Sequence, residues 1–465
     1  MKADSKPVAP AQAAPARGGF SSTLGALFAT IGSAVGLGNI WKFPYLTGEN
    51  GGAAFIIVYL LSTLLVGLPI MIAEIMLGRA AHANAIDTLR KLAPKKSFPW
   101  WIIGAMGALA AFLIMAFYSE VAGWVFAYIV KAFSGSILST DPAVTSQGFT
   151  SLVSSPWLSL ICQWVVLIVV SFVLIRGVSK GIEATTRRLI PILFVLLIIV
   201  GIRSVTLPGA SQGLAFLFTP DFTKLTGDAV LIALGLAFFK LSIGMGTMIT
   251  YGSYYRDDQN VPVSAIRAMG SDLLVSLLAG IAIFPAVFAF GYQPDAGASL
   301  LFITIPSVFA SMPLGNIFMV VFFILAAIAA MGAMLSIMEV PIAYLSEQFS
   351  LSRTKATLIT AGLLALIGST AALSNSVLAD VKVLGFTFFD LFDYLTSNIM
   401  LPIGGLLIAI FVGWVWGPEK IKSALTNQGA LKNQGLVNVI IILLRYVTPL
   451  LVLVVLLDGL NLLPF

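Results

Sequence analysis

The stretch Gly32-Ser33-Ala34-Val35-Gly36-Leu37-Gly38-Asn39 places three glycines within seven residues in the middle of an apolar segment. A second stretch, Ser242-Ile243-Gly244-Met245-Gly246, interrupts another apolar segment. Glycine costs a helix about 1 kcal/mol relative to alanine, and backbone groups left unpaired in hydrocarbon cost several more each. Such breaks survive in a membrane only where protein or an aqueous cavity satisfies the freed groups. The two stretches therefore predict two broken membrane-spanning helices beside a buried binding site.

The composition of the 465-residue chain is that of an integral membrane protein. Hydrophobic residues make up 59% of it, charged residues 10%, and the mean hydropathy is +1.01. One cysteine and one histidine provide no disulfide framework, no Cys/His metal cage and little material for catalysis. Because the basic residues behind the net charge of +6 are scattered between apolar runs, no nucleic-acid face is predicted. We therefore expect neither an enzyme nor a cofactor.

Runs of about 20 apolar residues, the length that crosses a hydrocarbon core, recur along the whole chain. They predict eleven spans, preceded by a disordered tail over residues 1–19 that contains neither a span nor a signal peptide. The predicted spans are 20–47, 53–78, 98–132, 156–175, 189–207, 227–255, 264–292, 314–349, 356–373, 386–416 and 436–456.

The distribution of basic residues predicts the orientation. With the N-terminus in the cytoplasm, the loops on the far side hold only Lys131, Arg203, Lys224 and Lys382, as the positive-inside rule requires. An odd number of spans then places the C-terminus outside.

The two breaks lie five spans apart, in matching positions of two five-helix blocks, 20–207 and 225–416, with a final helix at 436–458. A block with an odd number of spans inverts the next block, which is typical of alternating-access carriers. Broken helices present free N–H groups and positive dipole ends to a carboxylate, and free carbonyls to an ammonium or a cation. The alternative is that these glycines only allow close helix packing. Packing accounts for a single glycine-rich break more readily than for two breaks in matching positions. The pattern predicts a carrier for a zwitterionic amino acid.

The same residues resemble the neurotransmitter:sodium symporter family. The similarity includes residues 32–45 and 49–55, and then, in family order, 74–79, 250–254 and 337–341. It covers nearly all of 20–456, and the lack of a twelfth helix is similar to the shorter bacterial members. The resemblance implies an all-α polytopic protein of the bacterial cytoplasmic (inner) membrane. Its fold would be a LeuT-type 5+5 inverted repeat with helices 1 and 6 broken and an eleventh helix added.

The resemblance also implies a substrate site. The carboxylate would meet backbone amides around Gly36 and Gly38 and the Tyr118 hydroxyl, and the amine would meet carbonyls and the Ser242 hydroxyl. The form Gly244-Met245-Gly246 resembles relatives that accept bulky hydrophobic or aromatic amino acids. The predicted substrate-binding residues are Ser33, Ala34, Gly36, Leu37, Gly38, Ile114, Tyr118, Phe239, Lys240, Ser242, Met245, Ala333 and Ile337.

Two gates are implied by the same resemblance. The outer gate is the pair Lys42 and Asp393, where the family usually has arginine and aspartate, under a lid formed by Phe239 with Tyr118. A lysine lacks the bidentate fork of arginine, so this gate should hold less rigidly. The inner gate is assigned to Arg17, Tyr254 and Glu347.

The first sodium site of the family is altered here. Its first-helix ligands persist as Ala34 and Asn39, but Lys240 takes the position of a hydroxyl and Asp272 that of an amide. Because an ammonium and a sodium ion repel each other, and either new charge alone would be costly in hydrocarbon, we expect Lys240 and Asp272 to pair in place of the ion. The alternative is that Lys240 extends to an interface and Asp272 caps something unrelated.

The second sodium site is also degraded, so no metal ion is expected. Its two hydroxyl positions are occupied by Gly332 and Ala333, and the nearest side-chain oxygen, Ser336, is about one helical turn away. The remaining site positions are Gly32, Val35 and Ala329. A chloride site is not expected either, since only Tyr59 and Ser276 resemble parts of it and Leu236 takes the glutamine position.

These departures predict an amino-acid transporter that does not use sodium. A permanently charged Lys240 suits exchange or facilitated transport, whereas a Lys240 that releases a proton would couple uptake to H⁺. The alternatives are a conventional sodium:amino-acid symporter with altered sites and a non-transporting amino-acid sensor. No obligate protein partner is evident, so the expected partners are the amino acid, the lipid bilayer and, in one alternative, a proton.

Overall fold

The computed structural model describes residues 18–95, 97–294, 300–460 and 462. The predicted disordered tail (1–19) therefore lies almost entirely outside the described residues, as does Arg17 of the predicted inner gate. Within the described ranges the fold is helical, and the one β pairing is an isolated bridge between Val383 and Phe386.

The spanning segments follow the predicted order. They are α1 (Thr23–Ala34), η1 (Gly38–Lys42) and α2 (Phe43–Glu49); α3 (Ala53–Ser62), η2 (Thr63–Gly67) and α4 (Leu68–Ala81); α6 (Trp101–Ser134); α8 (Pro156–Ile175); η3 (Val178–Glu183) and α9 (Ala184–Val205); α11 (Gly227–Lys240) and α12 (Thr247–Gly252); α13 (Val261–Ala289); α15 (Gly315–Gln348); α16 (Arg353–Ala372); α17 (Phe388–Tyr394), η6 (Leu395–Met400), α18 (Leu401–Ile410) and η7 (Phe411–Trp416); α20 (Gln434–Ile442), η8 (Leu443–Val447) and α21 (Thr448–Gly459).

In the described part of the chain, nine helices are long and apolar enough to cross a membrane, and the bent pair Thr23–Ala34 and Gly38–Glu49 makes a tenth. The remaining predicted span is divided between α11 and α12, neither of which is long enough alone. The all-α membrane fold is thus confirmed. The division into repeats 20–207 and 225–416, with a final helix at 436–458, stays a prediction.

Both breaks occur at the predicted glycines. The first pair of helices bends by 47° where α1 ends at Ala34. In the second break, Gly244 and Gly246 have φ of 80° and 74°, a left-handed backbone that glycine adopts without strain. The freed N–H of Gly244 donates to the Glu74 carboxylate on α4 at 2.7 Å. Protein groups therefore satisfy the interrupted backbone, as the membrane requires.

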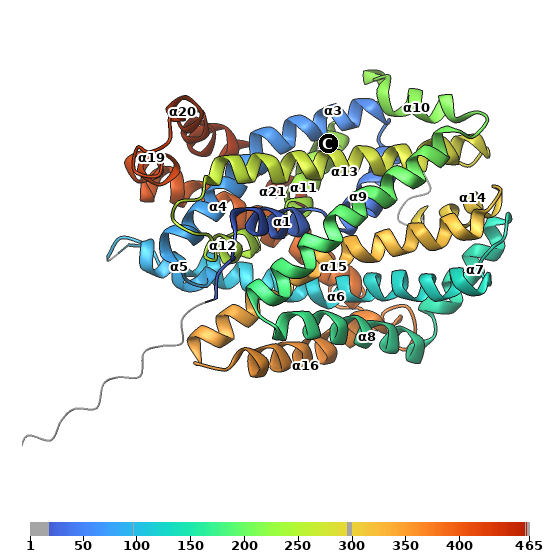
Figure 1. Cartoon of the computed structure of the whole chain (residues 1–465), viewed down its shortest axis with the longest axis horizontal. Helices are drawn as coiled ribbons and strands as arrows, with labels where there is room; N and C mark the ends of the chain where they lie inside the picture. Colours follow the sequence, from blue (N-terminus) through green and yellow to red (C-terminus); the bar gives the residue numbers. More distant parts are fainter. Residues whose placement is uncertain (1–17, 96, 295–299, 461, 463–465) are drawn as a thin grey trace, which may run out of the picture.

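The long helices α6, α8, α15 and α16 pack against one another on one side of the molecule (Figure 1). The broken helices lie beside them, because both α1 and α12 contact α15. Short helices that the hydropathy pattern missed, since they fall below spanning length, cover the two ends. They are α5 (Ala85–Leu92) and α19 (Pro418–Leu425) at one end and α7 (Pro142–Val153), α10 (Ala210–Phe218) and α14 (Thr304–Ala310) at the other (Figure 1).

Candidate functional site

Both helix breaks border one small cavity in the middle of the bundle. Every residue predicted to bind substrate lines it, apart from Leu37, and Asn39 joins them. The cavity has a volume of about 20 Å³, roughly the space of one water molecule, so its walls are closed against one another. The lining residues are Ser33, Ala34, Gly36, Gly38, Asn39, Ile114, Tyr118, Phe239, Lys240, Ser242, Met245, Ala333 and Ile337.

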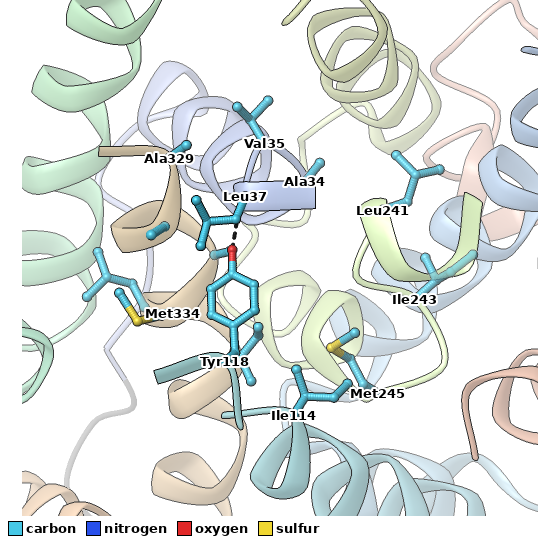
Figure 2. Close-up of a cluster of buried hydrophobic side chains, with 14 of the residues drawn as sticks. Ala34, Val35, Leu37, Ile114, Tyr118, Leu241, Ile243, Met245, Ala329 and Met334 are labelled. Carbon is cyan, nitrogen blue, oxygen red and sulfur yellow. Dashed lines mark hydrogen bonds between the residues drawn. The ribbon is translucent and has the colours of Figure 1, made fainter. Parts of the chain in front are cut away.

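The predicted carboxylate end differs from expectation in one respect. The Leu37 N–H donates to the Tyr118 hydroxyl at 2.8 Å, a bond that Figure 2 shows between α6 and the first break. The Gly36 N–H donates to the Asn39 side-chain oxygen at 3.1 Å. These two amides are therefore engaged within the chain rather than free for a ligand. Because the Tyr118 oxygen accepts from Leu37, its own O–H remains available to donate to a carboxylate.

The predicted amine end connects the two breaks to each other. The Ser242 hydroxyl donates to the Ser33 carbonyl at 2.8 Å. Ser242 itself has a positive φ of 52°, which turns its side chain toward the first break at the cost of backbone strain. The hydroxyl oxygen retains acceptor capacity for an ammonium group. The apolar side chains Ile114 and Met245, which also line the cavity, lie near Tyr118 (Figure 2).

At the predicted first cation position, Lys240 forms a buried ion pair with Asp272. Its Nζ lies 3.2 Å from the Asp272 carboxylate and 2.9 Å from the Tyr59 hydroxyl, and it also donates to the Ser276 hydroxyl. Its stem passes Gly38 on the cavity side, and neither charged side chain has any exposed surface. Lys240 therefore does not extend toward a membrane interface. Its three N–H groups meet three acceptors, so the ammonium is fully satisfied.

The other face of Asp272 is held by Asn39 and Tyr59. The Asn39 amide donates to Asp272 Oδ1 at 2.7 Å, and the Tyr59 hydroxyl lies 3.1 Å from Oδ2. The Lys240 ammonium also lies 4.8 Å from the centre of the Phe43 ring and 4.6 Å from that of Tyr59. The two residues that resembled remnants of a chloride site, Tyr59 and Ser276, thus serve as acceptors for Lys240. From the sequence, neither residue was predicted to contact Lys240.

At the second cation position, α1 and α15 are in direct contact. A Cβ added to Gly332 would lie 2.6 Å from the Gly32 carbonyl oxygen, so the backbone of one helix fills the space beside the other. The Ser33 hydroxyl donates to the Ser336 hydroxyl at 2.8 Å, which adds a bond between the same helices. Val35 and Ala329, the other positions of this site, lie in the surrounding apolar cluster (Figure 2).

The predicted outer gate closes above the cavity. Lys42 Nζ lies 3.6 Å from the Asp393 carboxylate and 4.2 Å from the centre of the Phe239 ring. The Asp393 side chain is 38% exposed and that of Lys42 18% exposed. Phe239 also lines the cavity below, so the cation–π contact links the gate to the roof of the candidate site.

The predicted inner gate contains partners that the sequence did not suggest. The Tyr254 hydroxyl donates to Glu339 at 2.6 Å, and Arg353 forms a two-pronged ion pair with the same carboxylate at 2.8 and 2.5 Å. Glu347 accepts from the backbone and side-chain amides of Asn84 at 2.9 and 3.0 Å. Glu339 belongs to the segment 337–341 that resembles the family. A glutamate inside an apolar span needs a basic partner, and Arg353, 14 residues later, was a candidate for one.

Comparisons with known proteins identify the family and the fold of the chain. A model of the sodium:neurotransmitter symporter family matches residues 17–141 and 142–463. The uncharacterized sodium-dependent transporter YhdH of Bacillus subtilis (strain 168) is 39% identical over 446 residues, which cover 96% of this chain and 98% of that protein. An uncharacterized sodium-dependent transporter of Haemophilus influenzae is 35% identical over 450 residues, which cover 95% and 98%.

Among solved structures, the fold is similar to that of MhsT in complex with L-phenylalanine. The TM-score is 0.87 and the sequence identity 42%, with 95% of this chain and 100% of that chain covered. Because these matches extend over nearly the full length of both partners, the predicted LeuT-type fold and the assignment as a membrane transporter rather than an enzyme are confirmed. The chain belongs to the sodium:neurotransmitter symporter family.

Proposed function

We propose that this protein carries a neutral, hydrophobic amino acid across the bacterial cytoplasmic membrane by alternating access, and that this transport does not require sodium. The observation that carries the second part is the Lys240 ammonium, which is bound by three acceptors at the first cation position.

Electrostatics oppose a sodium ion beside Lys240. Two positive charges about 4 Å apart repel by about 4 kcal/mol at an effective dielectric constant of 20. The oxygens of Asp272, Tyr59 and Ser276 already accept from Lys240, and the Asn39 amide already donates to Asp272. An ion at this position would have to displace those bonds. We infer that the Lys240–Asp272 pair takes the role of the bound cation permanently.

The second cation position supports the same proposal. Sodium prefers a nearly complete oxygen cage, whereas Gly332 and Ala333 contribute no side-chain oxygen to one. The close approach of Gly332 to the Gly32 carbonyl also leaves little room for an ion. The Ser33–Ser336 bond joins α1 to α15 without one. The relatives are named sodium-dependent transporters, which favours the alternative of a conventional sodium symporter. The two alternatives predict opposite effects of sodium on uptake.

The substrate class rests on the cavity walls. Ile114, Met245 and Ile337 are apolar, and Met245 has a long unbranched side chain that can move to widen a closed site. The structurally similar MhsT was solved with L-phenylalanine. Tyr118 and Ser242 supply the donor and acceptor that a zwitterion needs at its two ends. A large neutral amino acid such as phenylalanine fits this combination.

Lys240 also bears on the energy source. All three of its N–H groups have acceptors, and its counter-ion Asp272 is within 3.2 Å, so releasing a proton would leave a buried carboxylate without its cation. This arrangement favours a fixed charge, and hence exchange or facilitated transport, over coupling to H⁺.

The experiment is uptake of labelled L-phenylalanine by proteoliposomes that contain the purified full-length chain. We expect saturable uptake and counterflow that are equal in sodium and choline buffers and unchanged by an imposed pH gradient. The matched variant is Lys240→Thr with Asp272→Asn, which removes the ammonium from the predicted first cation position and should introduce stimulation by sodium. An absolute sodium requirement in the unaltered protein would overturn sodium independence, and binding without any flux would support the sensor instead.

A further inference from the structure

A buried carboxyl group on α6 lies outside the site described above. Glu120 is 1% exposed, in the middle of a helix long enough to span the membrane. Its Oε1 accepts a hydrogen bond from the Trp124 indole N–H at 2.7 Å. Its Oε2 is buried and has no hydrogen-bond partner among the described residues. Ionisable groups at such depth are costly, and they mark functional positions by default.

The surroundings of Glu120 suit a neutral acid rather than a carboxylate. The facing helix α8 contributes the uncharged Ser159 hydroxyl and the Cys162 thiol, and the Lys131 ammonium on α6 donates to the Gly148 carbonyl at 2.8 Å. No ion pair joins Glu120 to a basic residue in the described part of the chain. A charged carboxylate with one unpaired oxygen would be strongly disfavoured here, so the group carries its proton and keeps Oε1 as an acceptor for Trp124.

Trp124 connects Glu120 to the aromatic wall of a second cavity. The indole stacks on Phe389 of α17, with ring centres 5.9 Å apart and planes at 18°. It meets Phe149 and Phe302 edge-on at 5.3 and 5.7 Å. The hydrogen bond of its N–H and the packing of three rings together fix the orientation of the Trp124 indole.

This second cavity, the outer cavity, lies at the predicted outer gate. It has a volume of about 350 Å³, and its lining includes Trp124, Phe389, Asp393, Lys42 and Phe239. Phe389 and Asp393 are four residues apart on α17, so they share one helix face. Trp124 therefore supports the face of α17 that presents Asp393 to Lys42.

We propose that Glu120 is a positioning residue of the outer gate. As a neutral carboxyl group it holds the Trp124 indole against Phe389, and through this contact it orients α17 so that Asp393 reaches Lys42. The proposal rests on the proposed transport cycle but not on sodium independence.

The test measures how open the outer cavity is, with and without the Glu120–Trp124 bond. A reporter cysteine replaces Asn375, which lines the outer cavity, in a Cys162→Ala background that removes the single native cysteine. Its labelling rate with a membrane-impermeant maleimide is measured in intact cells that express the full chain. Glu120→Leu removes the acceptor and Trp124→Phe removes the donor. Glu120→Gln keeps an acceptor oxygen, and Gln163→Leu is the matched control.

Gln163 on α8 is a suitable control because its buried amide donates to the Ala116 carbonyl and to the Ser119 hydroxyl on α6, the helix of Glu120, but not to Trp124. We expect labelling to be about three- to tenfold faster in Glu120→Leu, the range that corresponds to losing one hydrogen bond. Trp124→Phe should match it, while Glu120→Gln and Gln163→Leu stay within about twofold of the parent. In a double mutant with Asp393→Asn, the effect of Glu120→Leu should shrink, since both changes open one gate.

The proposal is overturned if Glu120→Leu and Trp124→Phe both label at the parent rate. It is overturned if Gln163→Leu accelerates labelling as much as Glu120→Leu does. It is likewise overturned if the effects of Glu120→Leu and Asp393→Asn on the labelling rate are additive. It is also overturned if Glu120→Gln behaves like Glu120→Leu. If Glu120→Leu does not reach the membrane, Trp124→Phe alone decides. Labelling needs no substrate, so the result stands even if phenylalanine is not transported.

Discussion

Lys240 and Asp272 form an ion pair of 3.2 Å in the interior of the helix bundle, and neither side chain has exposed surface. A buried pair of this kind need not stabilise a fold, because desolvation offsets the attraction, but removing one partner leaves an uncompensated charge. Conversely, the pair can be replaced as a unit. Its two members lie on α11 and α13, so they join the second helix break to the neighbouring helix.

Asp272→Asn alone should destabilise the folded protein by about 3–5 kcal/mol, since it leaves the Lys240 ammonium buried without a counter-ion. Lys240→Thr with Asp272→Asn should be clearly more stable than Asp272→Asn alone. Thermal unfolding of the purified protein in detergent, followed by size-exclusion chromatography, measures both. A double variant that is no more stable than the single one would contradict the pairing.

Gly332→Ala should separate α1 from α15, because the new Cβ would lie 2.6 Å from the Gly32 carbonyl oxygen. Overpacking of this kind costs about 1–3 kcal/mol, and it should also lower uptake. The matched control is Gly362→Ala on α16, where an added Cβ meets nothing within 4 Å. Equal thermal shifts in the two variants would mean that the close contact does not matter.

Lys42→Arg should strengthen the outer gate, because a guanidinium can pair with both oxygens of Asp393. Lys42→Gln should weaken it. The pair is partly exposed, so each change is worth less than about 1 kcal/mol. The reporter cysteine at Asn375 should label more slowly in Lys42→Arg and faster in Lys42→Gln. The same direction of change in both variants would argue against a gating role for the charge pair.

Tyr118→Phe should weaken binding of L-phenylalanine by about tenfold, since the hydroxyl that remains free to donate is lost. Phenylalaninol, which has the amine and ring but no carboxylate, should bind the variant and the parent about equally. Thermal-shift titrations of the two ligands measure the difference. If both ligands lost affinity equally, Tyr118 would act through its bond to Leu37 and not through the carboxylate.

The chain order of the spans and the two breaks were predictable because hydropathy and glycine content are local properties. Glycines at 36, 38, 244 and 246 predict interrupted helices wherever the rest of the chain lies. The Lys240–Asp272 pair could also be anticipated, because two opposite charges at two ligand positions need each other in hydrocarbon. The short helices α5, α7, α10, α14 and α19 could not, since their stability comes from packing at the ends of the bundle.

The sequence by itself thus determined the membrane fold, and it predicted the place of the candidate site and the pairing of Lys240 with Asp272. Only the tertiary structure decided how each polar group is satisfied: Tyr59 and Ser276 accept from Lys240, Asn39 takes the Gly36 amide, and Glu120 holds Trp124. The physical reason is that a hydrogen bond between side chains depends on which helices pack together and on how they are aligned along their axes. The contacts of Lys240 with Tyr59 and Ser276 join residues far apart in the chain, and whether a short-range bond such as that of Glu120 with Trp124 forms depends on the helices packed around it.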